Sequence, residues 1–218
     1  MTKIWRRTLV GVAALAGLAV LGWIGAALYV NDVEQPAYRV VQQDGTIEIR
    51  DYPALVFAEV TRPGDRGQAV NAGFGPLARY IFARERGGPG VPMTAPVTQQ
   101  AQPIAMTAPV TQQPDAAASG NWVVRFIMPS RYTLETLPVP AGSDVRLVPS
   151  PATRRAVIRF SGVATDTAIA DQQSRLERWL AQRGIRPVGT ATYAYYNAPF
   201  TPWFLRRNEV WLEVPAGS

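Results

Sequence analysis

The stretch IEIRDYPALVFAEV, residues Ile47–Val60, carries the pattern that decides the fold. Its first half alternates isoleucine with charged residues, as in a strand that buries one face. Its second half is an almost continuous apolar run, and Pro53 separates the two halves. We therefore predict one strand over Thr46–Tyr52 and a second over Leu55–Thr61.

The same order of features returns later in the chain. Residues Val145–Phe160, VRLVPSPATRRAVIRF, contain Pro151, which lies 98 residues after Pro53, and again an apolar stretch flanks the proline on each side. Both segments precede a helical pattern. The two segments are therefore interpreted as equivalent parts of two similar halves, although a strand–strand–helix order is also common in unrelated α+β proteins.

Two helices are expected after these segments. Val70, Phe74, Leu77 and Ile81 are spaced as one face of a helix, but the tetrapeptide Gly73-Phe74-Gly75-Pro76 interrupts it. Proline is tolerated in the first turn of a helix and breaks an interior turn, so either a kink or a helix that begins near Pro76 is predicted. The second helix is expected over Asp171–Arg183, with Gly184 as its stop.

The octapeptide MTAPVTQQ occurs twice, at Met93–Gln100 and Met106–Gln113. Each copy is long enough for a short strand, and the two copies are compatible with an antiparallel hairpin. Pro96 and Pro109 cannot donate to a strand ladder, which favours edge or bulge positions for them. The remaining expected strands are Tyr38–Gln43, which pairs with Thr46–Tyr52 across Asp44-Gly45, and Val145–Val148, Ala156–Phe160, Trp122–Met128, Thr192–Tyr196 and Glu209–Val214.

Composition excludes several kinds of chemistry. The chain has 218 residues, neither cysteine nor histidine, and a formal net charge of +6. Thiolate metal sites, disulfides and catalytic sets built on cysteine or histidine are therefore excluded. No dense basic block marks a nucleic-acid face, and the sequence predicts a binding protein with no enzymatic activity.

The N-terminal sequence predicts a membrane anchor. Thr8–Val30 holds 23 residues without a charge, which as a helix would span about 34 Å and cross a hydrocarbon core. A cleaved signal peptide is the alternative, but its apolar region is normally shorter. Lys3, Arg6 and Arg7 precede the run, so we expect a single-pass inner-membrane protein with residues 1–30 as anchor, a cytoplasmic N-terminus, a linker over 31–37 and a periplasmic domain over 38–215.

Four motifs resemble those of the SOUL/haem-binding protein family. They are Ile49-Arg50-Asp51-Tyr52-Pro53, Ile104-Ala105-Met106-Thr107-Ala108-Pro109-Val110, Phe126-Ile127-Met128-Pro129, and the segment Pro199–Val210 with its core Trp203-Phe204-Leu205-Arg206-Arg207-Asn208-Glu209. The resemblance runs from about Tyr38 to Val214. It implies an α+β fold in which a distorted antiparallel β-barrel, built from two pseudo-twofold βαβ-type halves, is flanked by two helices, similar to bacterial effector-binding domains.

The resemblance also implies haem or another tetrapyrrole as ligand, held in an apolar groove between Phe74–Phe82 and Ala198–Arg207. A porphyrin needs an apolar wall and cations for its two carboxylates. The residues expected to supply the wall and its rim are Phe74, Leu77, Arg79, Tyr80, Ile81, Phe200, Trp203, Phe204, Arg206 and Arg207. Core packing of the helical stripe, an end plug made by Trp203 and Phe204, and an ion pair between these arginines and Glu209 are the alternatives.

Because the chain has no histidine, haem iron would have no protein ligand or a tyrosine or methionine ligand. Tyr80, Tyr193, Tyr195 and Tyr196 are the nearest tyrosines to the expected groove. The rival hypotheses are a structural or protein-interaction module of the cell envelope without a small-molecule ligand, and a sensor of hydrophobic cations or lipids.

Overall fold

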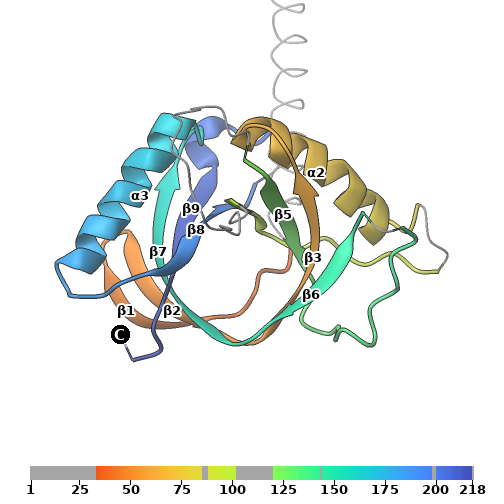
Figure 1. The fold of residues 1–218 in the computed structure, drawn as a ribbon, viewed down its shortest axis with the longest axis horizontal. Helices are drawn as coiled ribbons and strands as arrows, with labels where there is room; N and C mark the ends of the chain where they lie inside the picture. The colour runs from red at the N-terminus through yellow and green to blue at the C-terminus, as the bar shows by residue number, and fades with distance from the viewer. Residues whose placement is uncertain (1–32, 85–87, 102–119, 143, 198–199, 218) are drawn as a thin grey trace, which may run out of the picture.

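The computed structural model describes residues 33–84, 88–101, 120–142, 144–197 and 200–217. In these residues nine strands form one sheet, every adjacent pair is antiparallel, and two helices lie along the outer face of the curved sheet (Figure 1). The elements are β1 Arg39–Asp44, β2 Ile47–Tyr52, β3 Leu55–Arg62, α2 Arg66–Ile81, β4 Val97–Ala101, β5 Trp122–Ile127, β6 Arg146–Ser150, β7 Thr153–Ser161, α3 Asp166–Ala181, β8 Val188–Tyr195, the short 3₁₀ helix η1 Trp203–Leu205, and β9 Arg207–Val214.

The strand order confirms the two predicted halves. The sheet runs β1-β2-β7-β9-β8-β4-β5-β3-β6. The first half consists of β2, β3, α2, β4 and β5, and its equivalents in the second half are β6, β7, α3, β8 and β9, in that order. When each strand is replaced by its equivalent, the strand order of the sheet from β2 to β6 is the same read in reverse. Strand β1 has no equivalent. The pairing of β4 with β8 lies at the centre of this symmetry. A pattern repeated after 98 residues therefore corresponds to a repeated unit of structure.

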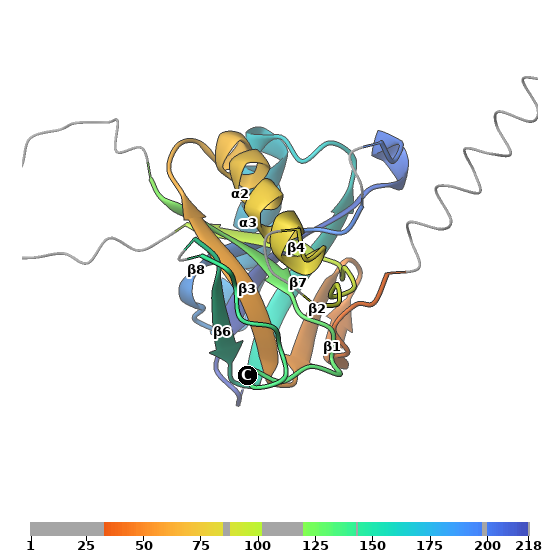
Figure 2. The same cartoon turned by 90° about the vertical axis from the view of Figure 1, so that its right-hand side faces the viewer.

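The expected distorted β-barrel is wrong, because the sheet does not close. The sheet is strongly curved, but β1 and β6 each have one paired edge and do not pair with each other, so the described strands form an open sheet (Figure 2). The α+β class, the antiparallel sheet and the two flanking helices are confirmed. Periodicity fixes which face of a strand is buried, but it does not fix whether the last strands of a sheet meet.

Helix α2 is continuous from Arg66 to Ile81, so the prediction of a start near Pro76 is wrong. Asp65 caps the helix by accepting a hydrogen bond from the Gln68 backbone N–H at 2.7 Å. Pro76 lies inside the helix and cannot donate to the Ala72 carbonyl. That carbonyl instead accepts a bond of 3.4 Å from Nε of Arg62, which supplies a donor where the proline has none.

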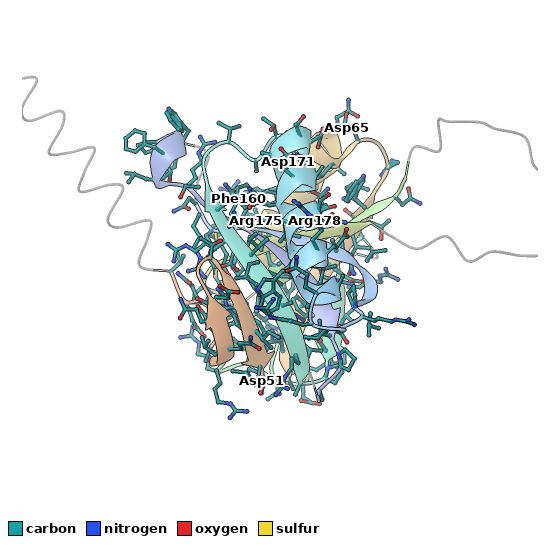
Figure 3. The ribbon with its side chains drawn as sticks, turned by 90° about the vertical axis from the view of Figure 1, so that its left-hand side faces the viewer. Asp51, Asp65, Phe160, Asp171, Arg175 and Arg178 are labelled. Carbon is teal, nitrogen blue, oxygen red and sulfur yellow. The ribbon has the colours of Figure 1, made fainter. Side chains whose placement is uncertain are left out.

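Helix α3 begins five residues before the predicted start at Asp171. Thr165 caps it by accepting a bond of 3.1 Å from the backbone N–H of Ala168. The first turns bury only Ile169, so the apolar periodicity that marks the helix is absent there. Asp171, Arg175 and Arg178 lie on its exposed face (Figure 3).

The first copy of the octapeptide repeat supplies β4, whereas the second copy lies outside the described residues. Val97–Gln100 pairs with β5 on one side and with β8 on the other. Both edges of this strand are therefore occupied, and the predicted hairpin between the two copies is wrong. Pro96 immediately precedes β4, and Pro109 is also outside the described residues.

The hydrophobic core consists of two clusters between the helices and the sheet and a third on the opposite face of the sheet. Helix α3 packs on β2, β7 and β9 through a cluster that includes Leu176, Leu180 and Ile158, and helix α2 packs on β3 and β5 through one that includes Leu77 and Val124. A third cluster lies on the opposite face of the sheet and joins both halves; it consists of Phe57, Ile127, Val157, Ala194 and Trp211.

Among the described residues no helix is long and apolar enough to cross a membrane. The predicted anchor over residues 1–30 lies outside the described residues, and so do residues 31 and 32 of the predicted linker.

Candidate functional site

A cleft of about 620 Å³ on the helix side of the sheet lies between α2 and the loop that precedes α3. Its wall comes from the first three turns of α2, the loop between β7 and α3, and the central strands β4, β8 and β9. The lining residues are Arg66, Gly67, Val70, Asn71, Phe74, Val97, Val163, Ala164, Tyr195, Asn197, Arg206 and Asn208. We call this space the interhelix cleft; its volume is in the range of small-molecule sites.

One half of the interhelix cleft is apolar. Val70 and Phe74 stand one turn apart on α2, and Val97 faces them from β4. The ring of Phe74 packs edge-on against Phe126, with 5.3 Å between the ring centroids, yet 41% of Phe74 remains exposed. The ring is therefore fixed by the core on one side and available to a ligand on the other.

Arg66 joins the two halves of the molecule at the other end of the cleft. It is the first residue of α2, and its guanidinium forms an ion pair of 2.8 Å with Asp166, the first residue of α3. The same guanidinium donates to the hydroxyl of Tyr195 and to the carbonyl of Ala164 at 2.9 Å. Burial opposes its charge most strongly, but Tyr195 and Asp166 together raise the pKa of Arg66 above its ordinary value.

Tyr195 is the tyrosine that lines the interhelix cleft. Burial is the largest influence on its hydroxyl, and it raises the pKa of Tyr195 even though Arg66 acts in the opposite direction. The phenol is therefore neutral at physiological pH. The other three tyrosines singled out in the sequence have hydroxyls bonded elsewhere: Tyr80 donates to the Pro138 carbonyl, Tyr193 to Gln173 and Tyr196 to Glu209.

The structure separates the predicted residues of α2. Phe74 lines the interhelix cleft, whereas Leu77, Tyr80 and Ile81 are buried in the core between α2 and the sheet. Arg79 lines a small separate cavity of about 50 Å³ near Pro140 and Asp144. For most of the stripe the core-packing alternative is therefore correct.

The predicted residues near β9 also separate. Arg206 lines the interhelix cleft, and its Nε donates to the Thr201 carbonyl at 2.8 Å. Arg207 points to the other face of the sheet, where it pairs with Glu209 at 2.7 Å and lies over the Tyr196 ring at 3.9 Å. The ion-pair alternative is thus correct for Arg207.

Phe200, Trp203 and Phe204 do not line the cleft. Trp203 and Phe204 are 60% and 58% exposed in η1, which projects from the body of the domain (Figure 2). The idea that they plug the end of a barrel is therefore wrong. Leu205 and Phe200 are exposed in the same region, so the segment is a surface of apolar side chains.

Sequence reasoning missed most of the cleft, because only Phe74 and Arg206 of its lining residues were predicted wall or rim residues. Gly67, Asn71, Val163, Ala164, Asn197 and Asn208 carry no periodic signal of a site. They come together because β4 and β8 pair in the middle of the sheet, which places the first turns of α2 beside the loop that precedes α3. Asn208 is held there by a bond of 3.0 Å to the Gly162 carbonyl, and the Arg207 backbone N–H donates to Asn197 at 2.6 Å.

The chain is similar to one known protein family over most of its length. The family model described as SOUL heme-binding protein matches residues 33–213, which is most of the chain. The chain belongs to the SOUL haem-binding family. No curated protein matches this SOUL-family chain.

Solved structures share the fold of this SOUL-family domain at low sequence identity. The EcmrR C-terminal domain aligns with a TM-score of 0.58 at 9% identity, over 82% of this chain and 98% of that one. EcmrR in a complex with DNA aligns with a TM-score of 0.56 at 12% identity, over 97% and 70% of the two chains. A protein described as a hydrolase from Listeria innocua aligns with a TM-score of 0.53 at 13% identity, over 80% and 94%. At these identities the likeness establishes the fold alone.

Proposed function

We propose that this SOUL-family protein binds haem or another tetrapyrrole in the interhelix cleft and catalyses no reaction. The observation that carries the proposal is the cleft itself, an apolar wall with arginines at its border in a chain that belongs to a haem-binding family. A tetrapyrrole is a flat apolar ring with carboxylates on one edge, and such a ligand needs both kinds of surface.

The residues of the cleft fit such a ligand. Val70, Phe74 and Val97 supply the apolar wall for the ring. Arg206 and Arg66 border the same space, and the planar guanidinium group suits a carboxylate because it can donate two parallel hydrogen bonds. Both arginines are candidates for a propionate, and Arg206 is the one to test first, because Arg66 also joins the two helices through Asp166.

Tyr195 is the candidate for contact with haem iron. Its phenol lies in the wall and accepts a hydrogen bond from Arg66, which partly offsets the effect of burial on the hydroxyl, so a bound iron would have to displace the phenol proton. When bound, haem would supply the iron chemistry, and the protein would hold the ring, exclude water and position the phenol. Because the chain has no histidine, tyrosine and methionine are the side chains that remain as iron ligands.

Titration of the full-length chain with hemin and with protoporphyrin IX tests the proposal, with protein-free buffer and detergent as the blank. We expect tryptophan quenching, and for hemin a Soret shift, at micromolar ligand. Phe74→Ala and Arg206→Gln should each weaken binding about tenfold, which corresponds to about 1.4 kcal/mol. Phe204→Ala is the matched control, because this exposed ring is outside the cleft. Equal binding by all four proteins would refute the assignment of the site.

A second candidate function is a protein-interaction module without a small ligand. The exposed apolar side chains around η1 favour it, because apolar patches on soluble surfaces commonly mark contact sites. This function predicts that hemin produces no saturable change, and that replacing Trp203 and Phe204 by serine abolishes capture of a specific envelope partner.

We further propose that residues 1–30 anchor the protein in the inner membrane and that the domain faces the periplasm. The uncharged run Thr8–Val30 after Lys3, Arg6 and Arg7 supports this orientation. A C-terminal reporter enzyme that folds only outside the cytoplasm should be active on the full-length chain. An inactive reporter on a stable fusion would contradict the orientation.

A further inference from the structure

A second cleft lies on the face of the sheet opposite the helices, with a volume of about 290 Å³. Side chains alternate along each strand, so Val97 and Gln99 of β4 face the helix side while Thr98 and Gln100 face this cleft. The polar lining includes Arg125, Arg155, Thr98, Thr192 and Glu213. We call it the inner cleft; it shares no lining residue with the interhelix cleft.

Arg155 is the unusual residue of the inner cleft. Its guanidinium lies over the rings of Tyr52 and Trp211, at 5.1 Å from each centroid. Within the part of the chain that the structure describes, it forms neither a hydrogen bond nor an ion pair with another side chain. Burial is the main influence on this group, and it lowers the pKa of Arg155 below its ordinary value.

The neighbouring arginines on the same face of the sheet form ion pairs. Arg50 is paired with Glu209 at 3.1 Å and with Glu48 at 2.6 Å. Arg125 donates to Glu59 at 2.8 Å and to Gln100 at 3.0 Å. Each of these cations has a partner within the protein, so the lack of one at Arg155 is a local feature and does not reflect a general property of this face.

Charged groups of both signs surround Arg155. Arg125 lines the same cleft and opposes the charge of Arg155. Glu213 also lines the cleft and favours that charge, but it is exposed and forms no ion pair with Arg155 in the described residues. A partly buried cation without a partner in the described residues is costly, and an anion that enters the cleft reduces that cost.

We propose that the inner cleft binds a small oxyanion, a carboxylate or a phosphate, with Arg155 as its principal contact. The guanidinium presents its N–H donors in a fork that matches two oxygens of such a group. Thr98 and Thr192 line the cleft from β4 and β8 and offer hydroxyl donors. The volume restricts the ligand to a small molecule, since drug-sized ligands occupy about 300–1,000 Å³.

The test measures thermal unfolding and binding heat of the full-length chain after dialysis against chloride. Inorganic phosphate, acetate and citrate are added separately at matched ionic strength, with sodium chloride as the reference. We expect at least one of these anions to raise the melting temperature by several degrees and to give saturable heat. Which anion is more effective distinguishes a phosphate site from a carboxylate site.

Two variants separate binding from structure. Arg155→Met keeps a long side chain against the Tyr52 and Trp211 rings but removes the charge, so the anion effect should disappear while the melting temperature in chloride stays the same or rises. Arg159→Met, an exposed arginine on the same strand β7, should keep the full anion effect. An equal anion effect in Arg155→Met, or no anion effect beyond chloride in the unaltered protein, would overturn the proposal.

Discussion

The carboxylate of Glu209 lies inside the curved sheet and accepts hydrogen bonds from four side chains. Arg50 and Arg207 donate at 3.1 and 2.7 Å, and the Tyr196 hydroxyl and the Trp211 indole donate at 2.8 and 2.7 Å. Burial acts most strongly to raise the pKa of Glu209, but the two arginines outweigh it, so the pKa is lowered. Glu209 therefore remains ionised and holds strands β2, β8 and β9 together.

Replacing Glu209 by Gln should destabilise the protein by about 3 kcal/mol, because loss of one member of a buried pair leaves the other uncompensated. Arg50, which is 2% exposed, would keep only Glu48 as a charged partner. Urea unfolding of the two proteins measures the difference. Glu213→Gln is the control on the same strand, and its exposed carboxylate should contribute less than about 0.5 kcal/mol. If Glu209→Gln lowered the free energy of unfolding no more than Glu213→Gln, the hydrogen bonds and ion pairs around Glu209 would add nothing to stability.

The sequence contains part of this information. Arg207 lies two residues before Glu209, where the predicted strand begins, and the structure extends the strand to Arg207, so the two side chains share a face and form an ion pair. The partner Arg50 lies 159 residues away along the chain, and no local pattern connects it with Glu209. The same limit explains Arg155, whose lack of a partner depends on what the other strands place around it.

Among the elements, α2 depends on one glycine for its close approach to the sheet. A Cβ added at Gly73 would lie 2.8 Å from Val124 on β5 and 3.1 Å from Val60 on β3. Gly75, two residues later, is different, because a Cβ there would meet only the end of the Arg79 side chain at 3.4 Å. Gly73 and Gly75, two of the three glycines in α2, therefore serve different purposes.

Gly73→Ala should destabilise the domain by about 1–3 kcal/mol, since the added methyl group forces α2 away from β5. Gly75→Ala should instead be neutral or stabilise by up to about 1 kcal/mol, because alanine favours the helix. Chemical denaturation of both variants gives the comparison. If both substitutions stabilised the protein, the close contact at Gly73 would be excluded.

Sequence periodicity identified both helices but not their limits. The apolar stripe of α2 gave its buried face, whereas the Arg62 side chain that compensates for Pro76 comes from the preceding strand. The start of α3 is marked by a Thr165 cap and polar turns. Apolar spacing says nothing about such turns, so a helix boundary defined by capping alone is missed.

At the scale of the whole molecule, the pseudo-twofold arrangement creates both clefts. The pairing of β4 with β8 brings the first residues of α2 and α3 together, and Arg66 and Asp166 close the contact on the helix side. The repeated pattern in the sequence predicts two similar halves. It does not predict how they join, and the interhelix cleft lies at that join, so only Phe74 and Arg206 of the predicted wall and rim residues line it.

The joined halves should unfold as one unit, because the third core cluster takes residues from each. Phe57 and Ile127 belong to the first half, and Val157, Ala194 and Trp211 belong to the second. Phe57→Ala should cost about 3–5 kcal/mol, since it leaves a cavity that both halves line. Far-UV circular dichroism and tryptophan fluorescence should report one transition, shifted equally, although Trp179 and Trp211 lie in the unaltered half. Val139→Ala, at an exposed position, should leave the transition unchanged. The contrary result would be two separate unfolding transitions, of which Phe57→Ala shifts only one. Each half would then be stable alone, and the central β4–β8 pairing would only join two independently folded units.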